Sequence, residues 1–136
     1  MAYNVRNINV LDLRASTGVG VSLPFSNAAV FETVYTTKDQ TKYNIINFLL
    51  TDPRERIFNP IFGAGIRGKL FQQITNDTAD ELDALIRSGM QRYFPNVTVT
   101  SLIFGGNPDA NTLTVELSYS INNTRENDNI TLSING

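Results

Sequence analysis

The chain contains no cysteine, no histidine and no tryptophan. Without cysteine there is no disulfide framework, no thiolate zinc site and no thiol nucleophile. Without histidine there is no Ser-His-Asp triad, and the usual general base near neutral pH is missing. Carboxylates, lysine and tyrosine remain for acid–base chemistry, so the composition disfavours an enzyme without excluding one.

Charge of either sign is sparse. Charged residues make up 18% of the chain, and 11 lysines and arginines against 13 acidic residues give a net charge of −2. The chain therefore lacks the basic excess that indicates a nucleic acid or an anionic membrane as a partner. We expect neither of these partners.

Long hydrophobic runs are missing too. No window approaches the roughly 18 apolar residues of a membrane span, and the first residues lack the apolar core of a secretion signal. The length of 136 residues and the hydrophobic content of 41% fit one globular domain over residues 1–136. We expect a protein that is made in the cytoplasm and stays there, or inside a particle assembled there.

Hydrophobic periodicity predicts strands at both ends of the chain and helices between them. A helix from Thr37 is expected to end at Asp52-Pro53, because the residue before a proline is pushed out of the helical region. A short helix is expected over residues 65–73, and a long one from Thr78 to Phe94. The predicted strands cover residues 8–13, 19–25, 30–35, 97–104, 113–121 and 130–134. This order indicates an α+β fold with a small, mostly antiparallel sheet packed against two to three helices.

Local signals mark the expected helix starts and the last turn. The sequences Thr37-Lys-Asp-Gln40 and Thr78-Ala-Asp-Glu81 have the spacing of a capping box, in which the threonine hydroxyl accepts from the third helical amide. The asparagine-rich stretch from Asn122 to Asn129 is typical of a turn between strands, because asparagine tolerates left-handed backbone.

Residues 53–64 show no regular period. They mix two prolines, one glycine and three charges with four large apolar residues. A loop this apolar is expected to pack against something. Its charges are Arg54, Glu55 and Arg56, and a glutamate can hold arginine donors that are aimed at a partner's carboxylate or backbone. Set beside a compact apolar loop, these charges favour a functional site over a solvated charge run.

The segment Gly63-Ala-Gly-Ile-Arg-Gly68 matches the G-x-G-x-x-G pattern of dinucleotide sites. No βαβ alternation surrounds it, so the pattern predicts a loop-to-helix junction and no nucleotide cofactor.

Two carboxylates could form the acid pair of a glycosidase. The dipole of the helix from Thr78 explains three of the acids, and no spacing marks the others as a pair. The candidates are Glu32, Asp39, Glu55, Asp77, Asp80, Glu81 and Asp83.

The terminal strands leave two interpretations open. A small sheet can keep unpaired edge groups that suit strand addition by a partner. An edge that faces water behind asparagine and threonine fits the same sequence equally well.

Three segments, taken together and in order, resemble the gene-25-type baseplate wedge proteins of contractile-tailed phages and related injection machines. They are Val21-Ser-Leu-Pro-Phe25, Asn44-Ile-Ile-Asn-Phe-Leu-Leu-Thr51 and Glu55-Arg-Ile-Phe-Asn-Pro60-Ile-Phe-Gly63-Ala-Gly-Ile-Arg67. The resemblance covers roughly residues 16–135, and its central stretch is the most specific part.

This resemblance implies a structural virion protein without cofactor or metal, sited in the baseplate close to the tail tube, with a fold similar to the core domain of sheath subunits. It implies that the first sheath ring attaches by strand exchange. It also implies that a Glu, a Pro and an Arg grip the helical core bundle of the other wedge proteins. These correspond to Glu55, Pro60 and Arg67, with Arg56 as a second candidate for the arginine. Arg54 stands where the family often has glycine.

One alternative comes from another class of protein. Some members of the family carry a lysozyme label, so a small glycoside hydrolase using Glu55 remains the rival to a structural role.

Overall fold

The computed structural model describes residues 10–14, 16–22, 33–69, 75–122 and 124–135. Its elements are the 3-10 helix η1 (Val10–Leu13), β1 (Gly20–Val21), β2 (Thr33–Val34), α1 (Thr37–Leu50), α2 (Ile66–Lys69), α3 (Asn76–Tyr93), β3 (Val97–Asn107), the 3-10 helix η2 (Pro108–Ala110), β4 (Thr112–Ile121) and β5 (Glu126–Asn135). Both sheets are antiparallel. The predicted α+β class is confirmed.

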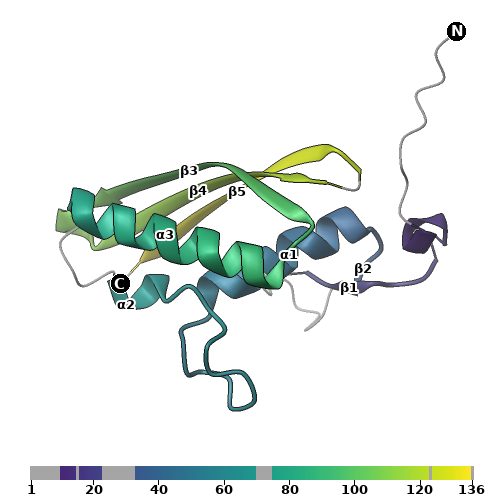
Figure 1. The fold of residues 1–136 in the computed structure, drawn as a ribbon, viewed down its shortest axis with the longest axis horizontal. Helices are drawn as coiled ribbons and strands as arrows, with labels where there is room; N and C mark the ends of the chain where they lie inside the picture. Colours follow the sequence, from purple (N-terminus) through teal and green to yellow (C-terminus); the bar gives the residue numbers. More distant parts are fainter. Residues whose placement is uncertain (1–9, 15, 23–32, 70–74, 123, 136) are drawn as a thin grey trace, which may run out of the picture.

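The main sheet has the strand order β3-β4-β5, and α1 and α3 pack against it (Figure 1). Alternate residues of β4 are buried, from Leu113 to Ile121, because successive side chains of a strand point to opposite faces. The buried face of β4 joins the buried residues of both helices in one core cluster. The predicted strands 97–104, 113–121 and 130–134 are therefore confirmed, with β3 and β5 longer than expected.

The first third of the chain departs from the prediction. Residues 10–13 form a 3-10 helix and not a strand, and β1 and β2 pair with each other in a separate two-stranded sheet. Residues 23–32, which include the end of one of the other two expected strands and the start of the next, lie outside the described residues. The Asp12 carboxylate accepts hydrogen bonds from the backbone N–H of Thr37 at 2.7 Å and from its hydroxyl at 2.8 Å. This contact, 25 residues apart in sequence, ties η1 to the start of α1.

Both helix caps lie earlier than predicted. The N-cap of α1 is Thr36, whose hydroxyl oxygen accepts from the Asp39 N–H at 3.2 Å. Thr37 is the first residue of α1, and its amide and hydroxyl both donate to Asp12. The N-cap of α3 is Thr75, which accepts from the Thr78 N–H at 3.4 Å. Thr78 therefore lies inside α3, and its backbone N–H donates the capping hydrogen bond.

Both long helices end shortly before a proline, as predicted. Thr51 is the C-cap of α1 ahead of Asp52-Pro53, and Phe94 is the C-cap of α3 ahead of Pro95. The predicted turn after β4 is shorter than expected, because β5 already begins at Glu126. Of the short helix expected over residues 65–73, Ile66–Lys69 is helical, and residues 70–74 lie outside the described residues.

Aromatic rings join α1, α3 and the segment between α1 and α2. The Phe48 ring lies 5.4 Å from Phe62, 5.9 Å from Tyr93 and 6.0 Å from Phe94, measured between centroids. Gly89 makes this packing possible, because a Cβ at Gly89 would overlap the Phe48 ring. Glycine destabilises the interior of a helix by about 1 kcal/mol relative to alanine. Here this loss occurs at a position where the close approach of α1 and α3 leaves no room for a side chain.

Candidate partner-binding loop

The segment between α1 and α2, residues 51–65, is termed the central loop. It projects from the body of the molecule, at the bottom of Figure 1. Three of the four residues predicted to bind a partner lie in it, namely Glu55, Arg56 and Pro60. Arg67 follows in α2, one residue after its start.

Backbone hydrogen bonds hold the base of the central loop. The Arg54 N–H donates to the Pro60 carbonyl at 2.7 Å, which joins the two arms of the loop. The Ala64 N–H donates to the Phe48 carbonyl at 3.1 Å, so the returning arm is attached to the last turns of α1. These bonds give the loop a defined shape without regular secondary structure.

Glycines allow this close approach. Gly63 has φ 122°, and a Cβ there would overlap the Thr51 carbonyl. Gly65 has φ 67°. Both conformations favour glycine over any other residue. The prediction that this glycine-rich segment forms a loop-to-helix junction is confirmed, with α2 starting at Ile66.

Glu55 is held by the backbone and not by an arginine. Its carboxylate accepts from the Asp52 N–H at 3.1 Å, while its own N–H donates to the Asp52 carbonyl at 3.2 Å. Arg54, just before it, has φ 76° and occupies the left-handed region. A backbone conformation that usually requires glycine is therefore adopted here by arginine, at a cost in backbone strain.

Arg56 is oriented by an aromatic ring. Its guanidinium carbon lies 3.9 Å from the centroid of Phe62, in cation–π geometry. Phe62 itself is buried and lies 5.0 Å from the Tyr93 ring. Arg56 is exposed, so its guanidinium is anchored on the core while its N–H groups remain accessible. This differs from the expected pairing of arginine with Glu55.

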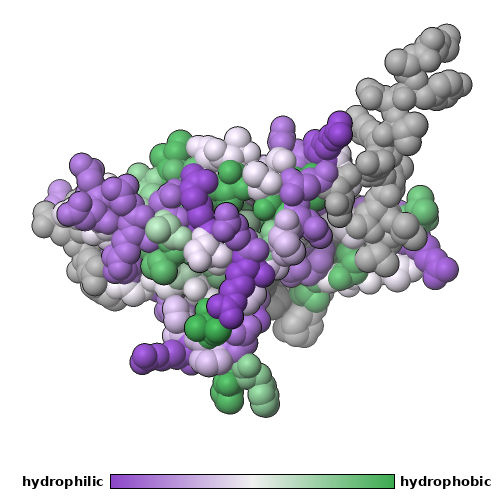
Figure 2. Space-filling model, in the orientation of Figure 1, coloured by the Kyte–Doolittle hydropathy of each residue, from purple (hydrophilic) through white to green (hydrophobic). Residues whose placement is uncertain are grey.

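The tip of the central loop carries apolar side chains that face solvent. Ile57 is 90% exposed, Phe58 101% and Ile61 60%. Figure 2 shows hydrophobic atoms gathered at this protruding tip. The expectation that the loop packs against something holds for Phe62 within this chain. Ile57, Phe58 and Ile61 remain largely exposed in the single chain, so for them the expectation stays a prediction.

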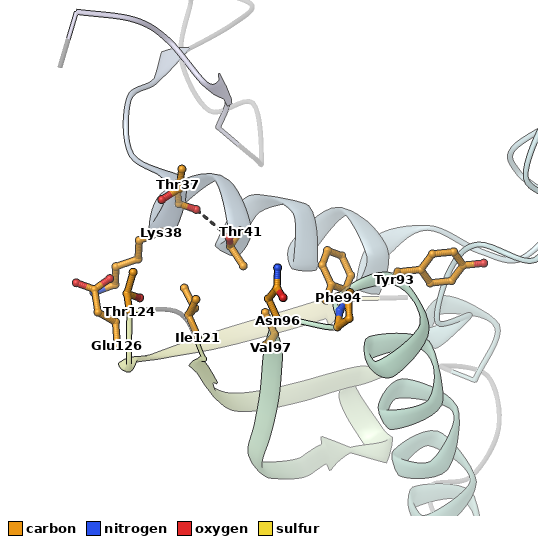
Figure 3. Close-up of a pocket in the computed structure, with 11 residues that line it drawn as sticks. Thr37, Lys38, Thr41, Tyr93, Phe94, Asn96, Val97, Ile121, Thr124 and Glu126 are labelled. Carbon is orange, nitrogen blue, oxygen red and sulfur yellow. Dashed lines mark hydrogen bonds between the residues drawn. The ribbon is translucent and has the colours of Figure 1, made fainter. Parts of the chain in front are cut away.

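Neither described cavity resembles a glycosidase site. The one in Figure 3 has a volume of about 180 Å³ and lies between the start of α1, the end of α3 and the sheet. Lys38, Thr124 and Glu126 lie at one end of it, and Glu126 is the only carboxylate among its lining residues. Another cavity, of about 330 Å³, has no carboxylate lining. Glu55 lines neither of them.

Two of the acids considered for a glycosidase pair form ion pairs instead. Glu81 lies 2.8 Å from Lys69 and Asp83 lies 2.8 Å from Arg87. Among the described residues, no group of three or more acidic side chains could hold a metal ion. The described helices also include none that is long and apolar enough to cross a bilayer.

The two outer strands of the main sheet differ. β5 pairs with β4 in ten consecutive positions without interruption, whereas the β3–β4 register shifts between Val99 and Ser101. Neither strand contains proline or lysine, so the register shift is what separates them. Bulges, prolines and lysines are the features that protect sheet edges from pairing with another chain. The β5 edge is therefore the less protected of the two.

A part-buried polar contact links α1 and the main sheet. The Tyr119 hydroxyl on β4 donates to Asp128 on β5 at 3.4 Å, and Lys42 on α1 lies 3.6 Å from the same carboxylate. Burial raises the pKa of Tyr119 well above its ordinary value, and the negative charge of Asp128 raises it further.

Comparison with known proteins matches residues 36–126 to the family model described as baseplate wedge protein gp25. Baseplate wedge protein gp25 of Enterobacteria phage T4 is 29% identical over 80 residues, which cover 59% of this chain and 61% of that protein. The match thus spans less than two thirds of the length of this relative.

Two solved structures share the fold. A protein of Geobacter sulfurreducens that bears the name of a tail lysozyme superposes with a TM-score of 0.66 at 19% identity, over 76% of this chain and 95% of that one. A chain of the anti-feeding prophage baseplate superposes with a TM-score of 0.61 at 17% identity, over 76% and 84%.

Proposed function

Because the chain belongs to the gp25 family of baseplate wedge proteins, we propose that it is a non-enzymatic part of a contractile-tail baseplate, which binds other wedge proteins through its central loop and starts the sheath by strand addition. Its place would be in the virion, close to the tail tube, after assembly in the host cytoplasm. Its partners would be the helical core bundle of the wedge and the tail sheath protein.

The observation that carries the proposal is the central loop itself. The two arms of the loop are already joined by a hydrogen bond, so the loop loses little further conformational entropy when it binds. More of the free energy of its contacts then contributes to affinity. Pro60 stiffens one arm, and its carbonyl accepts the hydrogen bond that joins the arms. Arg56 and Arg67 supply planar cationic donors, which suit the carboxylates and carbonyl ends of another chain's helices.

Glu55 would act in two ways. Its carboxylate fixes the turn by accepting a hydrogen bond from the Asp52 amide. A carboxylate can accept several hydrogen bonds, so its other lone pairs remain free to accept from a partner. The same bond favours a structural over a catalytic Glu55, since the residue is exposed and lines neither described cavity.

Glu55→Ala and Arg67→Ala test the loop. We expect both variants to fold as the wild type and to block assembly of the wedge, measured by co-purification of the wedge proteins and electron microscopy. Glu116→Ala and Arg92→Ala, which alter an exposed acid and an exposed arginine elsewhere, serve as matched controls. Normal wedge assembly by both loop variants would contradict the assignment.

The β5 edge is the proposed attachment point for the sheath. Its ten regularly paired residues present a long, unprotected row of backbone groups, and strand addition relies on such groups more than on particular side chains. A sequence-tolerant join of this kind suits a tube that grows by repetition of the same contact.

Lysines placed on the edge test this attachment. In the double variant Thr131→Lys/Ser133→Lys we expect intact baseplates without sheath, because edge lysines oppose strand pairing. The matched variant Thr98→Lys/Thr100→Lys puts the same charges on β3 and should permit sheath assembly. Loss of sheath only in the β3 variant would reverse the choice of edge.

The rival function is glycoside hydrolysis with Glu55 as the acid. Peptidoglycan release by purified wild type and Glu55→Gln separates the two functions. We expect no turnover from either protein, and turnover that disappears with the carboxylate would favour the enzyme.

A further inference from the structure

The tip of the central loop exposes a cluster of large apolar side chains, whereas elsewhere in the described part of the chain such residues are exposed singly. Ile57 and Phe58 are adjacent, and their side chains are 90% and 101% exposed, while Ile61 across the loop is 60% exposed. Other large apolar residues are exposed singly, such as Leu85 at 48% and Ile103 at 57%. Single exposed residues are ordinary, whereas a cluster of them indicates a binding surface.

Three arginines in or next to the central loop lack an acidic partner among the described residues. The described residues form ion pairs only at Lys42, Lys69 and Arg87, so Arg54, Arg56 and Arg67 have no acidic partner among them. The carboxylate of Glu55 is already engaged with the Asp52 amide, at 3.1 Å. Arg54 and Arg56 directly precede the apolar tip in the chain, and Arg67 follows the central loop in α2. A complementary surface would be apolar in its centre and acidic around it.

We propose that Ile57, Phe58 and Ile61 form an apolar knob that inserts into a groove on a neighbouring baseplate protein, and that carboxylates at the rim of this groove pair with Arg54, Arg56 and Arg67. This inference rests on the proposed function, and it names the chemistry of the surface that the central loop binds. The knob supplies affinity and the arginines supply orientation. The latched arms hold the knob in its binding shape before contact, which lowers the cost of association.

The shape and charge of the tip disfavour a second copy of this chain as the occupant. Two protruding loops placed together would bring unpaired arginines of both chains to one interface, and like charges at an interface oppose association. A stable interface also needs about 1,200 Å² or more of total buried surface, which two small convex tips do not provide. A concave partner meets both requirements, because a groove surrounds the knob.

Equilibrium binding of the full chain to wedge subcomplexes tests the inference. The probe is the complex of the other wedge proteins from the same particle, purified without this chain, and binding is measured at low and high sodium chloride. We expect Phe58→Ser to weaken binding about tenfold or more at both salt concentrations, as buried aromatic anchors do. Arg54→Gln/Arg67→Gln should weaken binding mainly at low salt, because salt screens charge pairs.

Controls separate binding from folding and from general stickiness. Phe58→Ser should unfold at the wild-type temperature, since its side chain makes no buried contact. Leu85→Ser and Ile103→Thr remove other exposed apolar groups and should leave binding unchanged. Sedimentation of the free chain and flotation with vesicles containing phosphatidylglycerol test the other occupants.

Each outcome decides the matter. Wild-type binding by Phe58→Ser would overturn the knob, while loss of binding in Glu55→Ala would still support the proposed function. Failure of the wild-type chain to bind the subcomplex would overturn both. A dimer or vesicle binding that Phe58→Ser abolishes would assign the tip to a second copy or to a lipid surface, and the inference would be wrong.

Discussion

In the three-stranded sheet, β4 buries every second side chain against α1 and α3, and its apolar residues face the core. In the central loop, the apolar residues Ile57, Phe58 and Ile61 face solvent, and one aromatic residue, Phe62, reaches the core. The two regions have similarly apolar sequences and opposite exposure. Burial in the first stabilises the fold, whereas exposure in the second leaves surface for association.

The largest expected difference between the regions is in the effect of deleting an aromatic ring. Phe48→Ala should lower the free energy of unfolding by about 3–5 kcal/mol, because it empties a site that is 1% exposed and packed by three other rings. Phe58→Ala should change it by less than about 0.5 kcal/mol. Urea unfolding of both variants measures the contrast, and equal losses would show that the loop tip is packed in solution.

The base of the central loop packs as part of the core. The expected change in the free energy of unfolding is smaller there than at Phe48. Gly63→Ala should lower the free energy of unfolding by about 2–3 kcal/mol, because the new methyl group meets the Thr51 carbonyl at a positive φ. The control is Gly68→Ala, where no atom lies within 4 Å of the new Cβ. It should stabilise the protein slightly, by up to about 1 kcal/mol, through helix propensity. Chemical denaturation measures both, and tolerance of Gly63→Ala would contradict the latched base.

Alkaline pH perturbs the sheet and leaves the loop tip unaffected. Burial raises the pKa of Tyr119 above the ordinary tyrosine value of about 10, so the unfolded chain loses this proton first as the pH rises. The stabilisation that the protonated Tyr119 gives to the folded state is fully present below about pH 10. It decreases by about 1.4 kcal/mol per pH unit above that pH, up to the folded-state pKa. Tyr119→Phe should remove this part of the decline. An identical alkaline profile in the variant would contradict the assignment.

The smallest expected effect lies at the turn of the loop. Arg54→Gly should raise the free energy of unfolding by about 1 kcal/mol or less, because glycine relieves the strain at φ 76° but gains freedom in the unfolded chain. Thermal unfolding measures this change. A clear loss of stability would mean that the Arg54 side chain makes a contact that the structure does not contain.

Local signals predicted the parts of the fold that depend on periodicity. The apolar spacing of α3 and the alternation of β4 gave their type and approximate extent, and Pro53 and Pro95 gave the helix ends. The caps were misplaced because a threonine also lies one residue before Thr37 and three residues before Thr78, and these earlier threonines cap the helices. The bonds from Thr37 to Asp12, which lies far away in the sequence, could not be read from local spacing.

The candidate site was predicted in part. The resemblance supplied Glu55, Arg56, Pro60 and Arg67, whose binding roles stay predictions, as does the single domain over residues 1–136. The sequence could not reveal that Glu55 holds the Asp52 amide or that Arg56 lies on the Phe62 ring. These contacts depend on how the two arms of the loop return to α1.

By itself, the sequence determined the secondary structure of the sheet and the long helices, because side-chain periodicity and proline act within a few residues. It also determined the sparse charge and the absence of thiol and imidazole chemistry. Only the tertiary structure decided which apolar residues of the central loop are buried and which are exposed. That outcome depends on the space available beside Phe48 and Gly89, which is created by two helices distant in the sequence.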